Sequence, residues 1–160
     1  MTIEIAVESP LRDDVRRLIA ALNATLLELS PPEHCYHMTV EEMADAATTV
    51  WIARRDGEAV GCGALRRIAG VDGASAGDGE VKRMYVRPDL QGQGIAGRII
   101  AEIEAMARAE GLSRLVLETG DRHPAAWRVY ERAGFSRRGP FGDYPDSGFS
   151  VFYEKPLAAN

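Results

Sequence analysis

A glycine-rich segment in the second half of the chain restricts the fold more than any other part of the sequence. It runs Gln91-Gly92-Gln93-Gly94-Ile95-Ala96-Gly97-Arg98 and lies between a predicted strand over 81–86 and a predicted helix over about 92–110. Glycines let the backbone approach a ligand closely, and the first N–H groups of a helix lack partners within the helix. This order of elements predicts an anion site suited to a pyrophosphate, with Arg98 as an additional donor.

The same glycines match the G-x-G-x-x-G pattern of dinucleotide-binding proteins, which is the main alternative. Gly92, Gly94 and Gly97 occupy its fixed positions, and Glu118 follows at about the spacing of the acid that binds a ribose. Three features argue against it. Residues 87–91 separate the strand from the glycines, the strand carries charged residues where a central parallel strand is apolar, and an antiparallel hairpin precedes it. A glycine-rich helix start that binds nothing is a further alternative, although it would cost helix stability.

The remaining periodicities predict alternating strands and helices. A strand is predicted over 2–8, a helix over 10–28 that Ser9 caps, and a short helix after the capping box at 39–42. A hairpin turns at Asp56-Gly57, a strand and a helix follow over 115–117 and 124–133, and two strands end the chain. The order β-α-α-β-β-β-α-β-α-β-β predicts an α/β fold with a mixed sheet, and the length of 160 residues predicts a single domain over 1–160.

Composition narrows the class of function. The net charge of −5 disfavours nucleic acid as the main partner. No run of about 18 apolar residues is present and the first residues lack the pattern of a signal peptide, so a cytoplasmic location away from membranes is predicted. Cys35 and Cys62 lie far apart, and no disulfide is expected between them in that compartment.

Two motifs resemble the GNAT superfamily of N-acetyltransferases. Residues 91–96 fit every fixed position of that family's acetyl-CoA signature, [Q/R]-x-x-G-x-[G/A], and residues 126–135 resemble its A-x-x-x-Y-x-x-x-G-F helix. The stretch 84–88 resembles the end of the family's fourth strand. The resemblance implies the GNAT fold: a mixed, mostly antiparallel sheet of about seven strands, about four flanking helices, and splayed parallel strands 4 and 5.

The resemblance also implies acetyl transfer from acetyl-CoA to a primary amine, directly and without a metal. The backbone of Met84, Tyr85 and Val86 would pair with the pantetheine arm and hold the acetyl carbonyl. Tyr130 would protonate the leaving thiolate. Further cofactor contacts are implied for Gln91, Gly92, Gln93, Gly94, Ile95, Ala96, Gly97, Arg98 and Ala126. The family often has Asn before its last core helix, and because residues 119–124 contain none, Asp121 or His123 would have to replace it.

The acceptor amine needs a group that takes its proton. Glu80 matches the position of a catalytic Glu in some family members, and strict alternation would place it on one face with Met84 and Val86. The alternative is a solvated charge at a strand end.

Two loops are predicted to shape acceptor choice, and loops that only pack on the protein are the alternative. In the GNAT fold the segment between the first two helices covers the acceptor site, which implies roles for Glu33, His34 and Tyr36, and the loop over 140–144 would add Tyr144. The acceptor would be a small amine or amino-acid-like molecule. The histidines around Cys35 lack a further ligand pair, so no metal site is predicted there.

Blocks at 29–33, 61–65, 117–120 and 140–144 resemble small bacterial GNAT proteins, some of them named as acetyltransferases related to indole acetate. These blocks identify neither the acceptor nor whether the chain forms a homodimer. Cys62 lies in an apolar strand and is predicted to pack there instead of carrying an acyl group. A module that binds acetyl-CoA as a signal without turnover is the alternative to an enzyme.

Overall fold

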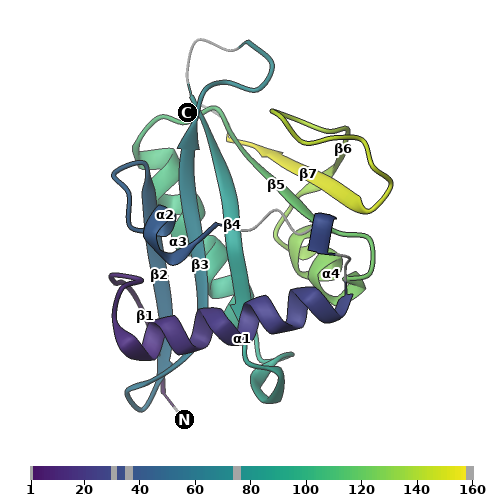
Figure 1. Ribbon diagram of the computed structural model, residues 1–160. Coiled ribbons are helices and arrows are strands. Elements are labelled where there is room, and N and C mark those ends of the chain that lie inside the picture. The colour runs from purple at the N-terminus through teal and green to yellow at the C-terminus, as the bar shows by residue number, and fades with distance from the viewer. Residues whose placement is uncertain (1, 30–31, 35–37, 74–76, 158–160) are drawn as a thin grey trace.

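A computed structural model describes residues 2–29, 32–34, 38–73 and 77–157. One seven-stranded sheet runs through it in the order β1-β2-β3-β4-β5-β7-β6 (Figure 1). The strands are β1 (Ile3–Val7), β2 (Thr48–Arg55), β3 (Glu58–Ile68), β4 (Asp78–Val86), β5 (Arg114–Gly120), β6 (Ser136–Arg138) and β7 (Ser150–Pro156). The helices are α1 (Asp13–Leu29), α2 (Val40–Met43), α3 (Ile95–Ala109) and α4 (Pro124–Arg132), with 3-10 turns η1 (Pro32–His34) and η2 (Pro88–Leu90). The predicted mixed sheet and the predicted order of its elements are confirmed.

Helices cover both faces of the sheet, as Figure 1 shows with α1 and α2 in front and α3 behind. The buried stripe of α1, which includes Val15 and Leu22, packs on Ile52 of β2 and Cys62 of β3. On the other side, α3 packs through the buried residues Ile95, Ile99, Ile100 and Ile103. We call these two sides of the sheet the α1 face and the α3 face.

Local sequence signals fix several of the turns. Asp56 and Gly57 both have positive φ, at 50° and 87°, which suits the two-residue turn of the predicted hairpin. The capping box of α2 is present, with Thr39 and Glu42 bonding each other's backbone. The prediction for Ser9 is wrong, because its hydroxyl accepts from the Leu11 N–H and closes a turn before α1 begins at Asp13.

The only parallel pair in the sheet of the described residues, β4 and β5, stays together over a short distance. It pairs at Gly79 with Leu115 and at Glu80 with Val116. Beyond those positions the strands diverge, so the β5-facing edge of the second half of β4 has no strand beside it (Figure 1). Within the described ranges, no helix is both long and apolar enough to cross a membrane.

A β-bulge interrupts β4 just after this divergence. Tyr85 pairs with Cys62 and Lys82 with Ala64, so Arg83 and Met84 together oppose the single residue Gly63. Arg83 adopts the left-handed conformation, with φ of 58°.

The bulge changes the face to which the side chains of β4 point. Glu80 contacts Tyr144 and Arg83 contacts Asn23 of α1, whereas Met84 packs into the core on the α3 face. The prediction that Glu80 shares a face with Met84 and Val86 is therefore wrong, because the extra residue breaks the alternation on which it rested.

Candidate active site

The glycine segment forms an open turn between β4 and α3. Gly92 and Gly94 both have φ of +82°, which favours glycine, and the Gln91 side-chain amide donates to the Val86 carbonyl at 3.0 Å. Gly94 is the N-cap of α3 and provides no side-chain cap, which leaves the first-turn N–H groups for a ligand. A Cβ at Gly97 would meet no atom within 4 Å, so packing does not explain a glycine inside this helix.

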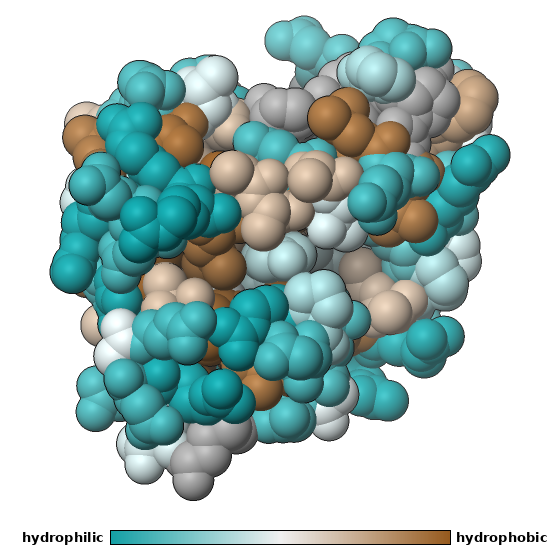
Figure 2. Space-filling model, turned by 60° about the horizontal axis from the view of Figure 1, so that its bottom comes forward, coloured by the Kyte–Doolittle hydropathy of each residue, from teal (hydrophilic) through white to brown (hydrophobic). Residues whose placement is uncertain are grey.

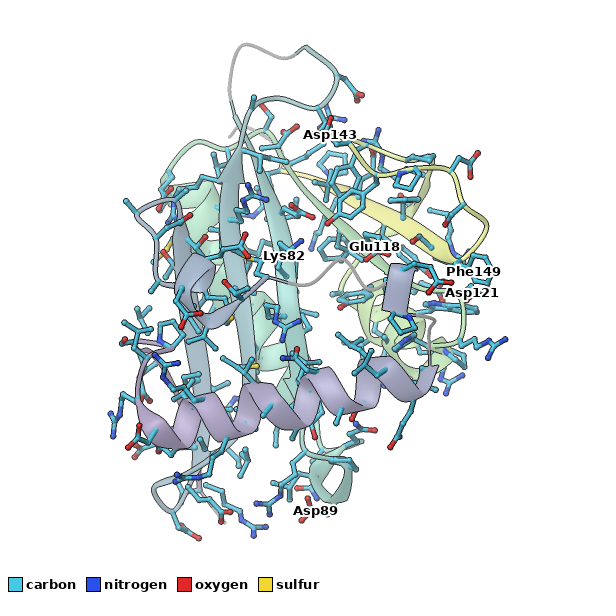
Figure 3. The ribbon with its side chains drawn as sticks, viewed as in Figure 1. Lys82, Asp89, Glu118, Asp121, Asp143 and Phe149 are labelled. Carbon is cyan, nitrogen blue, oxygen red and sulfur yellow. The ribbon has the colours of Figure 1, made fainter. Side chains whose placement is uncertain are left out.

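The arginines near the glycine segment are engaged within the protein. Arg98 donates to the Ile3 carbonyl of β1 at 3.1 Å. Arg87 forms ion pairs of 2.7 Å with both Asp89 and Glu58, and Figure 3 shows Asp89 at the end of the molecule where β4 meets α3. The anion-binding capacity of the turn therefore lies first in its backbone N–H groups. Figure 2 shows this end of the molecule, where apolar residues lie in a recessed middle surrounded by hydrophilic ones.

Tyr130 lies on α4 with its ring in the core. Its ring centroid is 5.9 Å from that of Phe135 and 6.0 Å from that of Tyr153. Burial, with a smaller contribution from the charge of Glu118, raises the pKa of Tyr130 well above its usual value of 10. The hydroxyl is thus protonated at neutral pH, and it makes no hydrogen bond to another described residue. A protonated hydroxyl without a partner can donate to a ligand.

Glu80 is buried at the point where β4 and β5 separate. It is 3% exposed, and its Oε2 accepts from the Tyr144 hydroxyl at 2.5 Å. Lys82 Nζ lies 3.5 Å from the same oxygen and donates to the Tyr144 oxygen at 2.9 Å, and Arg66 lies 4.0 Å from Oε1. Glu80 is therefore not a solvated charge, and the loop over 140–144 supplies its closest partner, Tyr144.

Glu118 is a second carboxylate near Glu80, and the sequence indicated it only as the ribose-binding acid of the dinucleotide alternative. It follows the buried run of β5 and accepts from the Ser150 hydroxyl at 2.5 Å. Burial raises the pKa of Glu118, and its charge interacts with those of Lys82 and Glu80. Figure 3 shows Lys82 on β4 and Glu118 on β5, on the two sides of the divergence. An acidic residue directly after an apolar strand was the available signal.

The other predicted side chains lie away from the group formed by Glu80, Lys82, Glu118 and Tyr144, or belong to residues that the structure does not describe. Glu33 is an exposed residue of η1, which also contains the backbone of His34, and Tyr36, like Cys35, lies outside the described residues. Ala126 packs against the main core. No group of three or more metal-ligating side chains occurs in the described ranges.

Asp121 and His123 occupy the stretch before α4 where the resemblance led us to look for Asn. The Asp121 N–H donates to the Phe149 carbonyl at 3.1 Å, and Figure 3 shows the two residues together. The His123 Nε2 is buried and has no hydrogen-bond partner among the described residues. Burial lowers the pKa of His123, so the ring is neutral at pH 7.

Comparisons with known proteins agree with this geometry. Residues 16–135 match the acetyltransferase (GNAT) family. A protein of Azospirillum brasilense named IAA acetyltransferase is 43% identical over 97% of this chain and 98% of its own length. A crystal structure from Klebsiella pneumoniae, assigned provisionally as an acyl-CoA N-acyltransferase, has a TM-score of 0.78 at 33% identity and covers 98% of this chain and 99% of that one. The PaiA N-acetyltransferase of Thermoplasma acidophilum, solved with coenzyme A, shares the fold with a TM-score of 0.72 at 18% identity, over 98% of this chain and 100% of its own.

Proposed function

Because this chain belongs to the GNAT acetyltransferase family, we propose that it transfers an acetyl group from acetyl-CoA to a primary amine of a small molecule, directly and within a ternary complex. The observation that carries the proposal is the divergence of β4 from β5, with the glycine turn at one end and Glu80, Glu118 and Tyr130 around it. The relative named IAA acetyltransferase agrees with a small-molecule acceptor.

The donor would bind along the free edge of β4. The N–H groups at the start of α3 would hold the pyrophosphate, with Gln93 and Ala96 beside them. Beyond Glu80, the backbone groups that face β5 have no strand beside them, so the pantetheine arm can take the place of a strand there. An amide of 84–86 would then stabilise the oxyanion that forms when the amine attacks the thioester carbonyl.

Proton transfer would involve two side chains, Glu80 and Tyr130. The attacking nitrogen must lose a proton, and Glu80 would take it through a water molecule. Tyr144 and Lys82 would hold the Glu80 carboxylate in position for this step. When the carbon–sulfur bond breaks, Tyr130 would donate its proton to the thiolate of coenzyme A. The high pKa of Tyr130 suits this acid role because it keeps the hydroxyl protonated until the thiolate forms.

An acceptor screen tests the proposal directly. We would incubate the chain with acetyl-CoA and a panel of small primary amines, and follow release of the free thiol. With a good acceptor, Tyr130→Phe and Glu80→Gln should each lower kcat by roughly 100-fold, as expected for general acid and base groups, while coenzyme A binding is retained. Tyr153→Phe is the matched control, because that hydroxyl contacts Glu131 and Arg137 away from the cluster.

Two outcomes would overturn the proposal. If coenzyme A binds tightly but no amine is ever acetylated, a module that senses acetyl-CoA is the better description. If turnover survives both substitutions, the roles given to Tyr130 and Glu80 are wrong.

A further inference from the structure

Arg83 is a buried cation without a counter-charge in the part of the chain that the structure describes. Its side chain is on the α1 face, where Nη2 donates a hydrogen bond to Oδ1 of Asn23, and the residue is only 7% exposed. The Nε atom is buried and has no hydrogen-bond partner among the described residues, and no carboxylate of those residues forms an ion pair with the guanidinium.

The other buried charges of the described chain are compensated. Glu80 has Tyr144 and Lys82, and Asp78 accepts from the Val71 N–H while Arg114 lies 3.5 Å away. A buried guanidinium without an opposite charge destabilises the folded state. That burial also lowers the pKa of Arg83 from its ordinary value, the direction expected for a cation without a partner. An anion bound beside the guanidinium would offset that destabilisation.

The bulge places this cation beside the proposed reaction centre. Arg83 follows Glu80 by three residues, which along an extended strand is about 10 Å. Both side chains are on the α1 face, and Arg83 lies beyond the last β4–β5 pair, where the thioester would bind. The side-chain oxygen of Asn23 accepts a hydrogen bond from Arg83. The NH₂ group of Asn23 can therefore donate to a ligand alongside the guanidinium.

We propose that Arg83 and Asn23 bind a carboxylate of the acceptor, so that the acceptor is an amino acid or a similar small molecule that carries both an amine and a carboxylate. The planar guanidinium is suited to a carboxylate in two-point contact. This inference rests on the proposed function, because it places the carboxylate relative to the amine that is acetylated.

The first experiment compares each L-amino acid with its carboxamide as acceptor, by thiol release and by thermal shift in the presence of coenzyme A. The wild-type chain should prefer the acid, and Arg83→Gln should raise the KM of the acid by roughly 10- to 100-fold, as for a lost charge-assisted hydrogen bond, and remove the preference. The KM for acetyl-CoA should not change. Arg108→Gln, at an exposed position of α3, is the matched control.

The second experiment separates ligand binding from a structural role. Arg83→Met removes the buried charge but keeps an unbranched side chain that fills the space of the arginine stem, so it should leave the thermal midpoint of the free protein unchanged or higher. The variant should also lose the thermal stabilisation that the best amino-acid acceptor gives to the wild-type chain. A fall in the midpoint of the free protein would mean that Arg83 serves the fold and would overturn the inference.

The outcomes separate this site from the proposed function. Turnover of amines without any preference for the acid overturns the carboxylate site and keeps the acetyltransferase. A rise in the KM for acetyl-CoA in Arg83→Gln assigns the residue to the donor and also overturns the site. A thermal shift that is specific for acids and depends on Arg83, without turnover of any amine, keeps the site and overturns the proposed function. Absence of both turnover and shift overturns both.

Discussion

The Tyr144 hydroxyl donates to the Glu80 carboxylate at 2.5 Å, although 64 residues separate the two in the chain. The ring of Tyr144 is held by edge contacts with Phe141 and Phe152, at 5.1 and 5.8 Å between centroids. Burial and the neighbouring charge of Glu80 raise the pKa of Tyr144 above its ordinary value of 10, so the hydroxyl remains a donor at neutral pH. The loop over 140–144 thus fixes the orientation of a carboxylate on a distant strand.

Tyr144→Phe should reduce both activity and stability. The substitution keeps the ring contacts but removes the donor from a buried carboxylate, so the free energy of unfolding in urea should fall by about 1–2 kcal/mol. If Glu80 takes the proton of the amine, kcat should fall by roughly tenfold because the carboxylate is less well oriented. Tyr153→Phe also removes a buried phenol hydroxyl and should leave kcat unchanged. Equal kcat in Tyr144→Phe and wild type would contradict this positioning role.

Gly97→Ala should have opposite effects on stability and on cofactor binding. A helix favours Ala over Gly by up to about 1 kcal/mol, and no atom from outside this first turn of α3 lies within 4 Å of the new methyl group, so unfolding in urea should require more denaturant. If the pyrophosphate lies against this turn, the same methyl group should raise the KM for acetyl-CoA by several-fold. Glu102→Ala, at an exposed position in the same helix, is the control and should leave that KM unchanged.

Gly63→Ala should destabilise the fold through the bulge. A Cβ there would lie 2.5 Å from Met84 Sδ and 2.6 Å from Ile99 Cγ2. Met84 is flexible, but the β-branched Ile99 has little freedom in a helix, so we expect a loss of about 1–3 kcal/mol in urea unfolding. Gly139→Ala, with open space around it, should change stability by less than about 0.5 kcal/mol. A loss in Gly63→Ala as small as the one expected for Gly139→Ala would show that the bulge tolerates a side chain at position 63.

Glu118→Gln should change how stability depends on pH. Burial raises the pKa of Glu118 above its ordinary value of 4.5, so the folded state binds more protons than the unfolded state once the pH exceeds that value. The carboxyl therefore stabilises the fold below pH 4.5, and this contribution is lost as the pH rises through the folded-state pKa. Relative to Glu118→Gln, the wild-type chain should lose unfolding free energy as the pH rises above 4.5. A wild-type chain that gains stability relative to the variant over that range would contradict the raised pKa.

Features with short-range signals were predictable from the sequence. The Asp56-Gly57 turn and the glycine turn before α3 each depend on a few adjacent residues whose backbone preferences are strong. The two motifs at 91–96 and 126–135, which implied the GNAT fold, agree with the family match over 16–135. That membership removes the dinucleotide alternative that the three glycines alone left open.

Features that depend on pairing between strands were not predictable in the same way. The residues around Arg83 contain no glycine to indicate a left-handed position, and the bulge lies opposite Gly63 of the neighbouring strand, where Met84 occupies the space that a Cβ at position 63 would need. The partnership of Glu118 with Ser150 joins two strands through tertiary structure, so periodicity along the chain gave no sign of it.

The single extra residue in β4 has a consequence for comparing this chain with its relatives. Side chains of β4 before and after position 83 belong to two different alternations, and one insertion or deletion there would reverse one half of the strand while leaving the sheet intact. An alignment can therefore match every residue of this strand to a relative and still assign positions on the α1 face and the α3 face the wrong way round. Roles along β4 transfer only between chains that share the bulge.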